Sequence, residues 1–118
     1  MDEIRRHLLL DGGINVDEAL GRFLGNETLM MKFLLLFPGD ETFSRLRQAM
    51  EQSDAAGAFE AAHTLKGVVG NLSMERLYGR TCDLVEDLRT GDLAAAEKKM
   101  PALEEAYSQV LAALRQLT

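Results

Sequence analysis

The stretch Ala62-His63-Thr64-Leu65-Lys66-Gly67, which continues as Val68-Val69-Gly70-Asn71-Leu72, decides the fold of this chain. Read as a helix at about 100° per residue, it has two faces. His63 lies roughly 150° from the centre of the apolar face, and Lys66, Gly67 and Gly70 share its side of the helix because they follow at i+3, i+4 and i+7. The apolar face is the kind of stripe that packs into a core, and it comprises Ala58, Ala61, Ala62, Leu65, Val69 and Leu72.

The two glycines on the histidine face need a reason, because glycine inside a helix costs about 0.5–1 kcal/mol relative to alanine. Phosphoryl transfer supplies that reason. A neutral imidazole is a good nucleophile near neutral pH, and a phosphate bound to it carries nearly two negative charges, which a nearby lysine partly offsets. We therefore predict that His63 accepts a phosphoryl group, that Lys66 stabilises it, and that Gly67 and Gly70 leave room for a second protein.

The motif Ala-His-Thr-Leu-Lys-Gly, followed by Gly70-Asn71-Leu72, resembles the signature of the histidine-containing phosphotransfer (HPt) domain family. The likeness continues through Leu77-Tyr78 and the segment 84–88, and Asp54 fits the acidic residue before the histidine helix. It covers nearly the whole chain from Asn15 onward. The resemblance implies an antiparallel four-helix bundle that carries phosphoryl groups between the aspartate-bearing receiver domains of a two-component relay.

Composition limits the other function classes. A chain of 118 residues suffices for one domain, and 47% apolar with 27% charged residues fits neither a disordered tail nor a membrane protein. The start of the chain is acidic and lacks a signal peptide's basic region. The single cysteine, Cys82, suits a reducing cytoplasm and is expected to be a small core residue. The net charge of -6 argues against nucleic-acid binding.

Helical periodicity without two-residue alternation predicts an all-α fold, an antiparallel up-down four-helix bundle with short additional N-terminal helices. We expect one domain over residues 1–118, in which residues 1–25 form the N-terminal helices and residues 26–118 form the bundle. The core is expected to include Ala19, Leu20, Phe23 and Leu24 from the second helix and Met74, Leu77, Tyr78, Cys82, Val85 and Leu88 from the sixth. The predicted helices cover residues 4–10, 16–24, 27–37, 40–52, 55–72, 74–89 and 93–117.

Short polar residues and prolines predict where the helices begin and end. Pro38-Gly39 must break the helix before it, although one continuous helix is usual in the HPt family at this point. Pro101 lies within a regular apolar stripe and should kink the last helix rather than end it. The expected N-caps are Asn15, Asn26, Ser53 or Asp54, Ser73 and Asp92, with Glu18 completing a capping box after Asn15.

The segment 27–37 is apolar almost all round and has more hydrophobic residues than one core stripe needs. The plainer interpretation is that the N-terminal helices cover the excess. The alternative is a docking patch for a receiver domain that includes Met30 and Met31. Thr64 and Asn71 flank the histidine site and are expected to face water, without a role that the sequence reveals.

Three functions compete for this sequence. The first is a monomeric phosphoryl carrier that is not itself an enzyme, since the chain has no nucleotide-binding loop, no cofactor motif and no zinc-ligand spacing. Its partners would be response-regulator receiver domains or a hybrid sensor kinase, and the receiver would supply Mg²⁺ and the aspartate. The second is the dimeric histidine domain of a sensor kinase, whose family typically has an acidic residue where Thr64 stands. The third is a helical adaptor without the chemistry, which the presence of both His63 and Lys66 disfavours.

Overall fold

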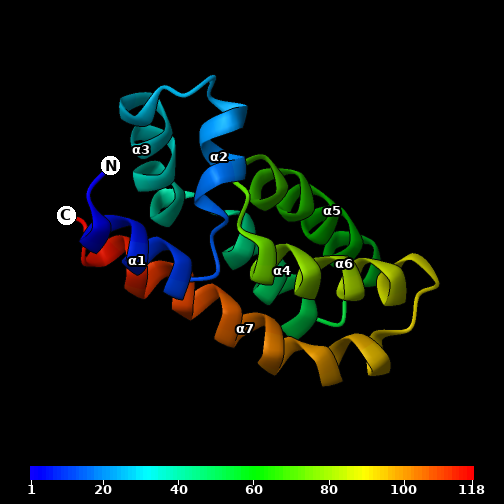
Figure 1. The fold of residues 1–118 in the computed structure, drawn as a ribbon. Helices are drawn as coiled ribbons and strands as arrows, with labels where there is room; N and C mark the ends of the chain where they lie inside the picture. The colour runs from blue at the N-terminus through cyan, green and yellow to red at the C-terminus, as the bar shows by residue number, and fades with distance from the viewer.

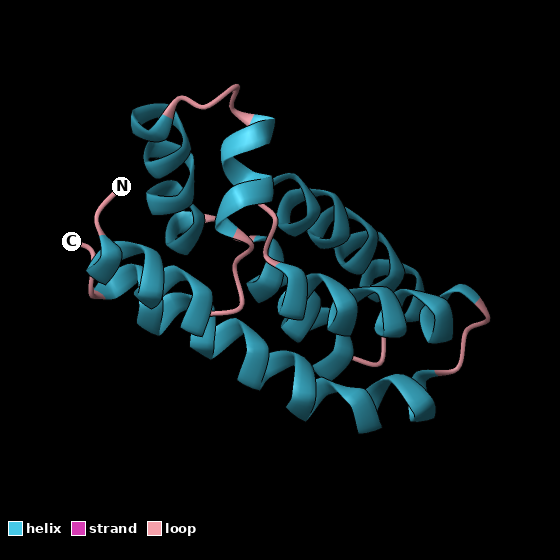
Figure 2. Cartoon of the chain, viewed as in Figure 1, coloured by secondary structure: helices cyan, strands magenta, loops and turns pink.

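The computed structural model describes residues 1–118, which form helices and loops but no strands (Figures 1 and 2). This confirms the predicted all-α class. In chain order the elements are α1 (Glu3–Asp11), α2 (Val16–Arg22), α3 (Glu27–Leu36), the short 3-10 helix η1 (Phe37–Gly39), α4 (Thr42–Glu51), α5 (Ala55–Asn71), α6 (Glu75–Arg89) and α7 (Leu93–Arg115).

The histidine helix α5 packs between α4 and α6, and α6 packs in turn on α7. The inward face of α5 consists of Ala58, Ala62, Leu65 and Val69, all fully buried. Leu72 is also buried, so five of the six residues of the predicted stripe are confirmed, whereas Ala61 is half-buried. The rings of Phe43 in α4 and Tyr107 in α7 stack 3.8 Å apart between centroids and join those two helices. The neighbours of α5 thus cover its apolar sides and leave one face of the helix open.

Four of the helices begin at side-chain caps that the sequence predicts. The side-chain oxygens of Asn15, Asn26, Asp54 and Asp92 each accept a hydrogen bond from the backbone N–H three residues later, at 2.9–3.1 Å. Such a cap satisfies one of the free N–H groups of the first turn and contributes about 1 kcal/mol. Glu18 does not complete a capping box at Asn15, because its carboxylate binds Ser73 and Arg22 instead.

The cap predicted at Ser73 is wrong. Ser73 has a φ of 54° and is buried in the turn between α5 and α6, and α6 is preceded by Met74 without a side-chain cap. The Ser73 hydroxyl accepts a hydrogen bond from Arg22 Nε at 3.0 Å and donates one to Glu18 Oε1 at 2.9 Å. These contacts attach α2 to the turn between α5 and α6, and residues distant in the sequence therefore determine the role of this serine.

The break predicted at Pro38 is confirmed, and Pro101 does not end α7, as predicted. Pro38 lies in η1 and separates α3 from α4, after which the Asp40 carboxylate accepts a hydrogen bond from the Thr42 N–H at 2.8 Å. Pro101 lies inside α7, which continues to Arg115. A proline removes one backbone hydrogen bond from a helix interior, and the apolar stripe that continues on both sides of Pro101 keeps α7 packed on the core.

Three core predictions are wrong in α2 and α6. Leu24 is 95% exposed, because α2 ends at Arg22 and Leu24 adopts a φ of 54° in the following turn. Tyr78 is exposed and Cys82 is only half-buried. The inward face of α6 is rotated from the predicted one and consists of Leu77, Thr81, Leu84, Val85 and Leu88.

The alternative interpretation of segment 27–37, a docking patch at Met30 and Met31, is wrong for those residues. Their relative exposures are 0% and 9%, and both belong to the core. The exposed side of α3 instead carries Phe33 at 43% and Leu36 at 59%. The N-terminal helices cover α3 only in part, because α1 packs along the C-terminal half of α7 (Figure 1) while α2 contacts α3 through the stacked Phe23 and Phe33 rings, 5.6 Å apart.

Candidate functional site

The open face of α5 presents His63 to solvent. His63 and Gly67 are exposed, whereas Ala62 and Leu65, on the other side of the helix, are fully buried. The helix is held in this rotation by its buried stripe and begins at the Asp54 cap. The imidazole is therefore accessible on a backbone that is packed on its opposite side.

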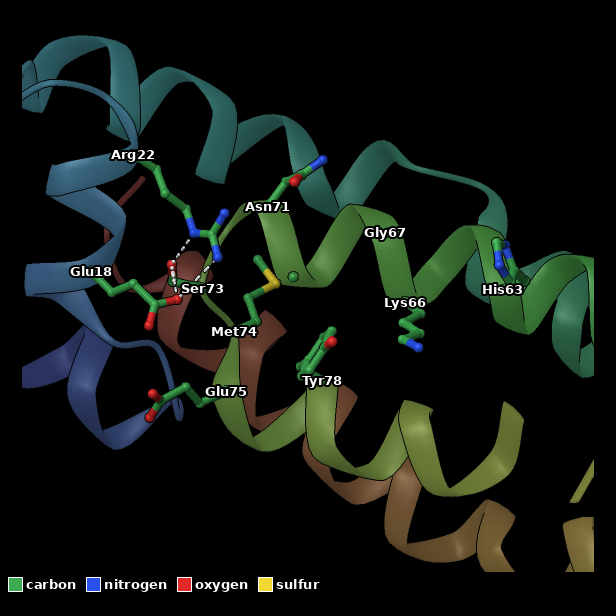
Figure 3. A pocket seen from close by; sticks show the side chains of 11 residues that line it. Glu18, Arg22, His63, Lys66, Gly67, Asn71, Ser73, Met74, Glu75 and Tyr78 are labelled. Carbon is green, nitrogen blue, oxygen red and sulfur yellow. Dashed lines mark hydrogen bonds and ion pairs between the residues drawn. The ribbon is translucent and has the colours of Figure 1, made fainter. Parts of the chain in front are cut away.

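A hollow of about 420 Å³ lies beside the histidine, between α5, α6 and the end of α2 (Figure 3). It brings together five of the residues that the sequence proposes for the site: His63, Lys66, Gly67, Gly70 and Asn71. The other lining residues are Glu18, Arg22, Ser73, Met74, Glu75 and Tyr78. His63 is at one end of the hollow, and the contacts between Glu18, Ser73 and Arg22 are at the other (Figure 3).

Lys66 is half-buried and extends from α5 toward α6, on the same side of the hollow as Tyr78 (Figure 3). Its ammonium group forms none of the salt bridges of the chain. The neighbouring Cys82 side chain raises the pKa of the Tyr78 hydroxyl. The phenol is thus neutral at physiological pH, and Lys66 is the charged group of the hollow nearest to His63 in the sequence.

The two glycines of the site differ in their surroundings. A Cβ atom at Gly67 would have no neighbouring side chain within 4 Å, so this position faces open space next to His63. A Cβ atom at Gly70 would lie 3.0 Å from Cε1 of Tyr78. Gly70 therefore accommodates the Tyr78 ring against α5, and close packing between helices accounts for this glycine.

The two flanking residues lie on different sides of α5. Thr64 is exposed in a separate groove between α4 and α5 and does not line the histidine hollow. Asn71 is exposed and lines both the histidine hollow and a second, more apolar hollow. This second hollow, which we call the apolar hollow, is formed by Phe33, Leu36, Phe37, Asp40, Val68, Asn71 and Leu72.

His63 also has an aromatic neighbour that was not predicted from the sequence. Phe59 precedes His63 by one helical turn, and the two ring centroids are 6.0 Å apart with 48° between the ring planes. The i−4 spacing on one helix was available in the sequence and could have indicated this pair. Arg22, Tyr78 and the exposed residues of α3 come from other helices, and no local pattern connects them with His63.

A family model described as the Hpt domain matches residues 35–113. The chain belongs to the Hpt domain family. Comparisons with curated proteins and with solved structures gave no significant match.

Membership connects this Hpt domain with phosphorelays of two-component signalling, in which such domains are phosphocarriers that interact with receiver domains and kinases. The matched segment contains α4, α5, α6 and all but the last two residues of α7, and hence His63 and Lys66, whereas α1 and α2 precede it. None of the helices has the length and apolar character needed to cross a membrane. No three of the His, Cys, Asp and Glu residues are grouped in a way that could hold a metal ion.

Proposed function

We propose that His63 is the phosphoacceptor of this Hpt domain, and that it receives a phosphoryl group from a receiver-domain aspartate or a kinase and passes it to another receiver. The observation that carries the proposal is the exposure of His63 on the Hpt helix, next to the open position of Gly67. A partner must bring its own reacting group to within bonding distance of the ring, and only an exposed imidazole permits this.

The transfer step needs one neutral imidazole nitrogen. Its lone pair forms a bond to phosphorus while the bond between phosphorus and the aspartyl oxygen breaks, and the aspartate leaves as a carboxylate. The other ring nitrogen keeps its proton, and the reverse step delivers the group to a second receiver. We assign the metal ion, Mg²⁺, and the acidic residues to the receiver, with no cofactor bound by this chain.

We also propose the family's antiparallel up-down four-helix arrangement as the scaffold, with residues 1–25 added before a bundle over residues 26–118. The contacts of α5 with α4 and α6, and of α6 with α7, support this arrangement. We propose that the chain acts as a monomer in the cytoplasm, where its single cysteine stays reduced. The direct test is incubation with phosphorylated receivers, in which label should move into this chain and then to a second receiver. A chain that takes no label from any active receiver would contradict the proposal.

We assign Lys66 the role of offsetting the phosphoryl charge. Lys66→Ala should slow transfer to His63 about fivefold, because an ion pair near the surface contributes about 1 kcal/mol. The rate is measured by incubation with labelled receiver and quenching of the reaction at successive times. The midpoint temperature of thermal unfolding should be unchanged. Lys98→Ala, which removes an exposed lysine from α7, is the matched control. Equal rates for the two variants would remove Lys66 from the site.

We propose that the receiver also covers the apolar hollow, which adjoins the histidine hollow at Asn71. Leu36→Glu places a charge at its most exposed apolar side chain. It should weaken receiver-dependent phosphorylation about tenfold, because a docked receiver would bury that charge without a partner. Titration of the receiver concentration measures the effect. Ile4→Glu, on the exposed side of α1, is the control and should transfer normally. Normal transfer by the Leu36 variant would exclude this surface.

A further inference from the structure

Phe59 is the aromatic side chain nearest to His63, and its contact with the imidazole has no assigned role. Side chains of a helix lean toward its N-terminus, so the imidazole is directed back over the turn that carries Phe59. The centroid distance of 6.0 Å and the 48° tilt lie within the range of favourable aromatic pairs. Gly67, one turn in the other direction, offers no side chain to hold the ring.

The Phe59 ring is itself held in place. It is half-buried and packs against the core cluster. On its outer side the guanidinium of Arg89, at the C-terminal end of α6, lies 5.5 Å from the ring centroid. Arg89 Nε is in turn 3.5 Å from Glu86 Oε1. Phe59 thus has contacts with α6 as well as with its own helix. Its ring can therefore limit the rotation of the more exposed His63 imidazole.

We propose that Phe59 is a positioning residue, which limits the rotation of the His63 imidazole and holds the ring in one orientation on the exposed face of α5. This inference rests on the proposed phosphoacceptor role of His63. An unrestrained exposed ring exchanges among several rotamers, and it loses this conformational freedom when it attacks a donor from one of them. A ring that is already restrained loses less entropy in reaching the transition state.

The test uses phosphoramidate, a small donor that needs no protein partner. The imidazole lone pair forms the new bond to phosphorus, the bond between phosphorus and the ammonium nitrogen breaks, and ammonia leaves. The unaltered chain and both variants are compared at one and the same pH. Phe59→Leu keeps an apolar side chain but removes the ring, and Phe59→Tyr keeps the ring.

Phe59→Leu should react with phosphoramidate about three- to tenfold more slowly than the unaltered chain, which corresponds to about 0.7–1.4 kcal/mol. Phe59→Tyr should stay within about twofold of the unaltered rate. Equal rates for the leucine variant and the unaltered chain would overturn the proposal. So would a tyrosine variant as slow as the leucine variant, because the effect would then not depend on the aromatic ring.

A second measurement does not require phosphorylation. In the unaltered chain, NMR should detect cross-relaxation between the ring protons of Phe59 and His63, and ring-current shifts of the imidazole protons that disappear in Phe59→Leu. Absence of the cross-relaxation in the unaltered chain would overturn the proposal without any variant. If these signals are present but no receiver transfers label to His63, the phosphorelay role fails and the positioning contact stands.

Discussion

His63→Gln should abolish phosphate incorporation while the helical fold is retained. Glutamine keeps a polar side chain of similar reach, but its amide nitrogen has no available lone pair for attack on phosphorus. Because His63 is exposed and belongs to no cap or salt bridge, its replacement should change the free energy of unfolding by no more than about 0.5 kcal/mol. Acid-labile label on the chain after incubation with a phosphorylated receiver measures the loss.

His7→Gln is the matched control for this experiment. His7 is the other histidine of the chain and is exposed on α1, outside the residues that match the Hpt family. The His7 variant should be labelled like the unaltered chain. Label that persists in the His63 variant would contradict the phosphoacceptor assignment, and label lost in the His7 variant would move the assignment to α1.

Gly67→Leu should block transfer from a receiver without damaging the fold. The new side chain meets no neighbour within the chain, so it would extend into the space that the partner needs beside His63. We expect the receiver-dependent rate to fall at least about tenfold, or about 1.4 kcal/mol. Stability should rise by about 0.5–1 kcal/mol, because leucine has a better helix propensity than glycine. Labelling kinetics and thermal unfolding measure the two effects.

Gly79→Leu provides the control for this variant. Gly79 is also an exposed helical glycine with no neighbour within 4 Å of a Cβ atom, but it lies on α6 and does not line the histidine hollow. It should gain similar stability and accept label normally. Phosphoramidate should phosphorylate both variants, since it is far smaller than a receiver. Normal receiver-dependent transfer to the Gly67 variant would show that partners do not use this space.

The sequence predicted those parts of the fold that depend on local chemistry. A cap such as Asp54 acts on an N–H three residues away, and the break between α3 and α4 follows from Pro38 alone. The core stripe of α5 was also predictable, because its polar face is well separated from its apolar face. The helix boundaries agree with the predictions to within a few residues for the same reason.

The failed predictions depend on how the helices pack against one another. A helix that is apolar almost all round, like α3, does not reveal which side faces inward. The exposed patch was therefore considered at Met30, whereas the exposed side chains are Phe33 and Leu36. Ser73 looked like a cap until Glu18 and Arg22 reached it from α2. In α6 the inward face includes Thr81, whose hydroxyl donates to the Leu77 carbonyl at 2.7 Å and can therefore be buried.

The candidate site was predictable where its residues share one helix. Periodicity alone placed Lys66 and Gly67 beside His63, and the hollow brings these three together. The same reasoning assigned Gly70 to partner access, whereas the Tyr78 ring from α6 accounts for its small size. Spacing along a chain cannot identify a neighbour that another helix contributes. Lys66 and Gly67 were therefore predictable from the sequence, whereas Tyr78 was not.

The attachment of α2 beside Ser73 makes the two ends of the histidine hollow unequal. The Arg22 end is closed by α2, which precedes the segment matched by the Hpt family, and no helix of this kind closes the end at which His63 is exposed. A domain that docked along α5 would meet α2 at the Arg22 end of the hollow and no such helix at the His63 end. Residues outside the segment shared with the family therefore make the two ends of the site unequal for any domain that docks there.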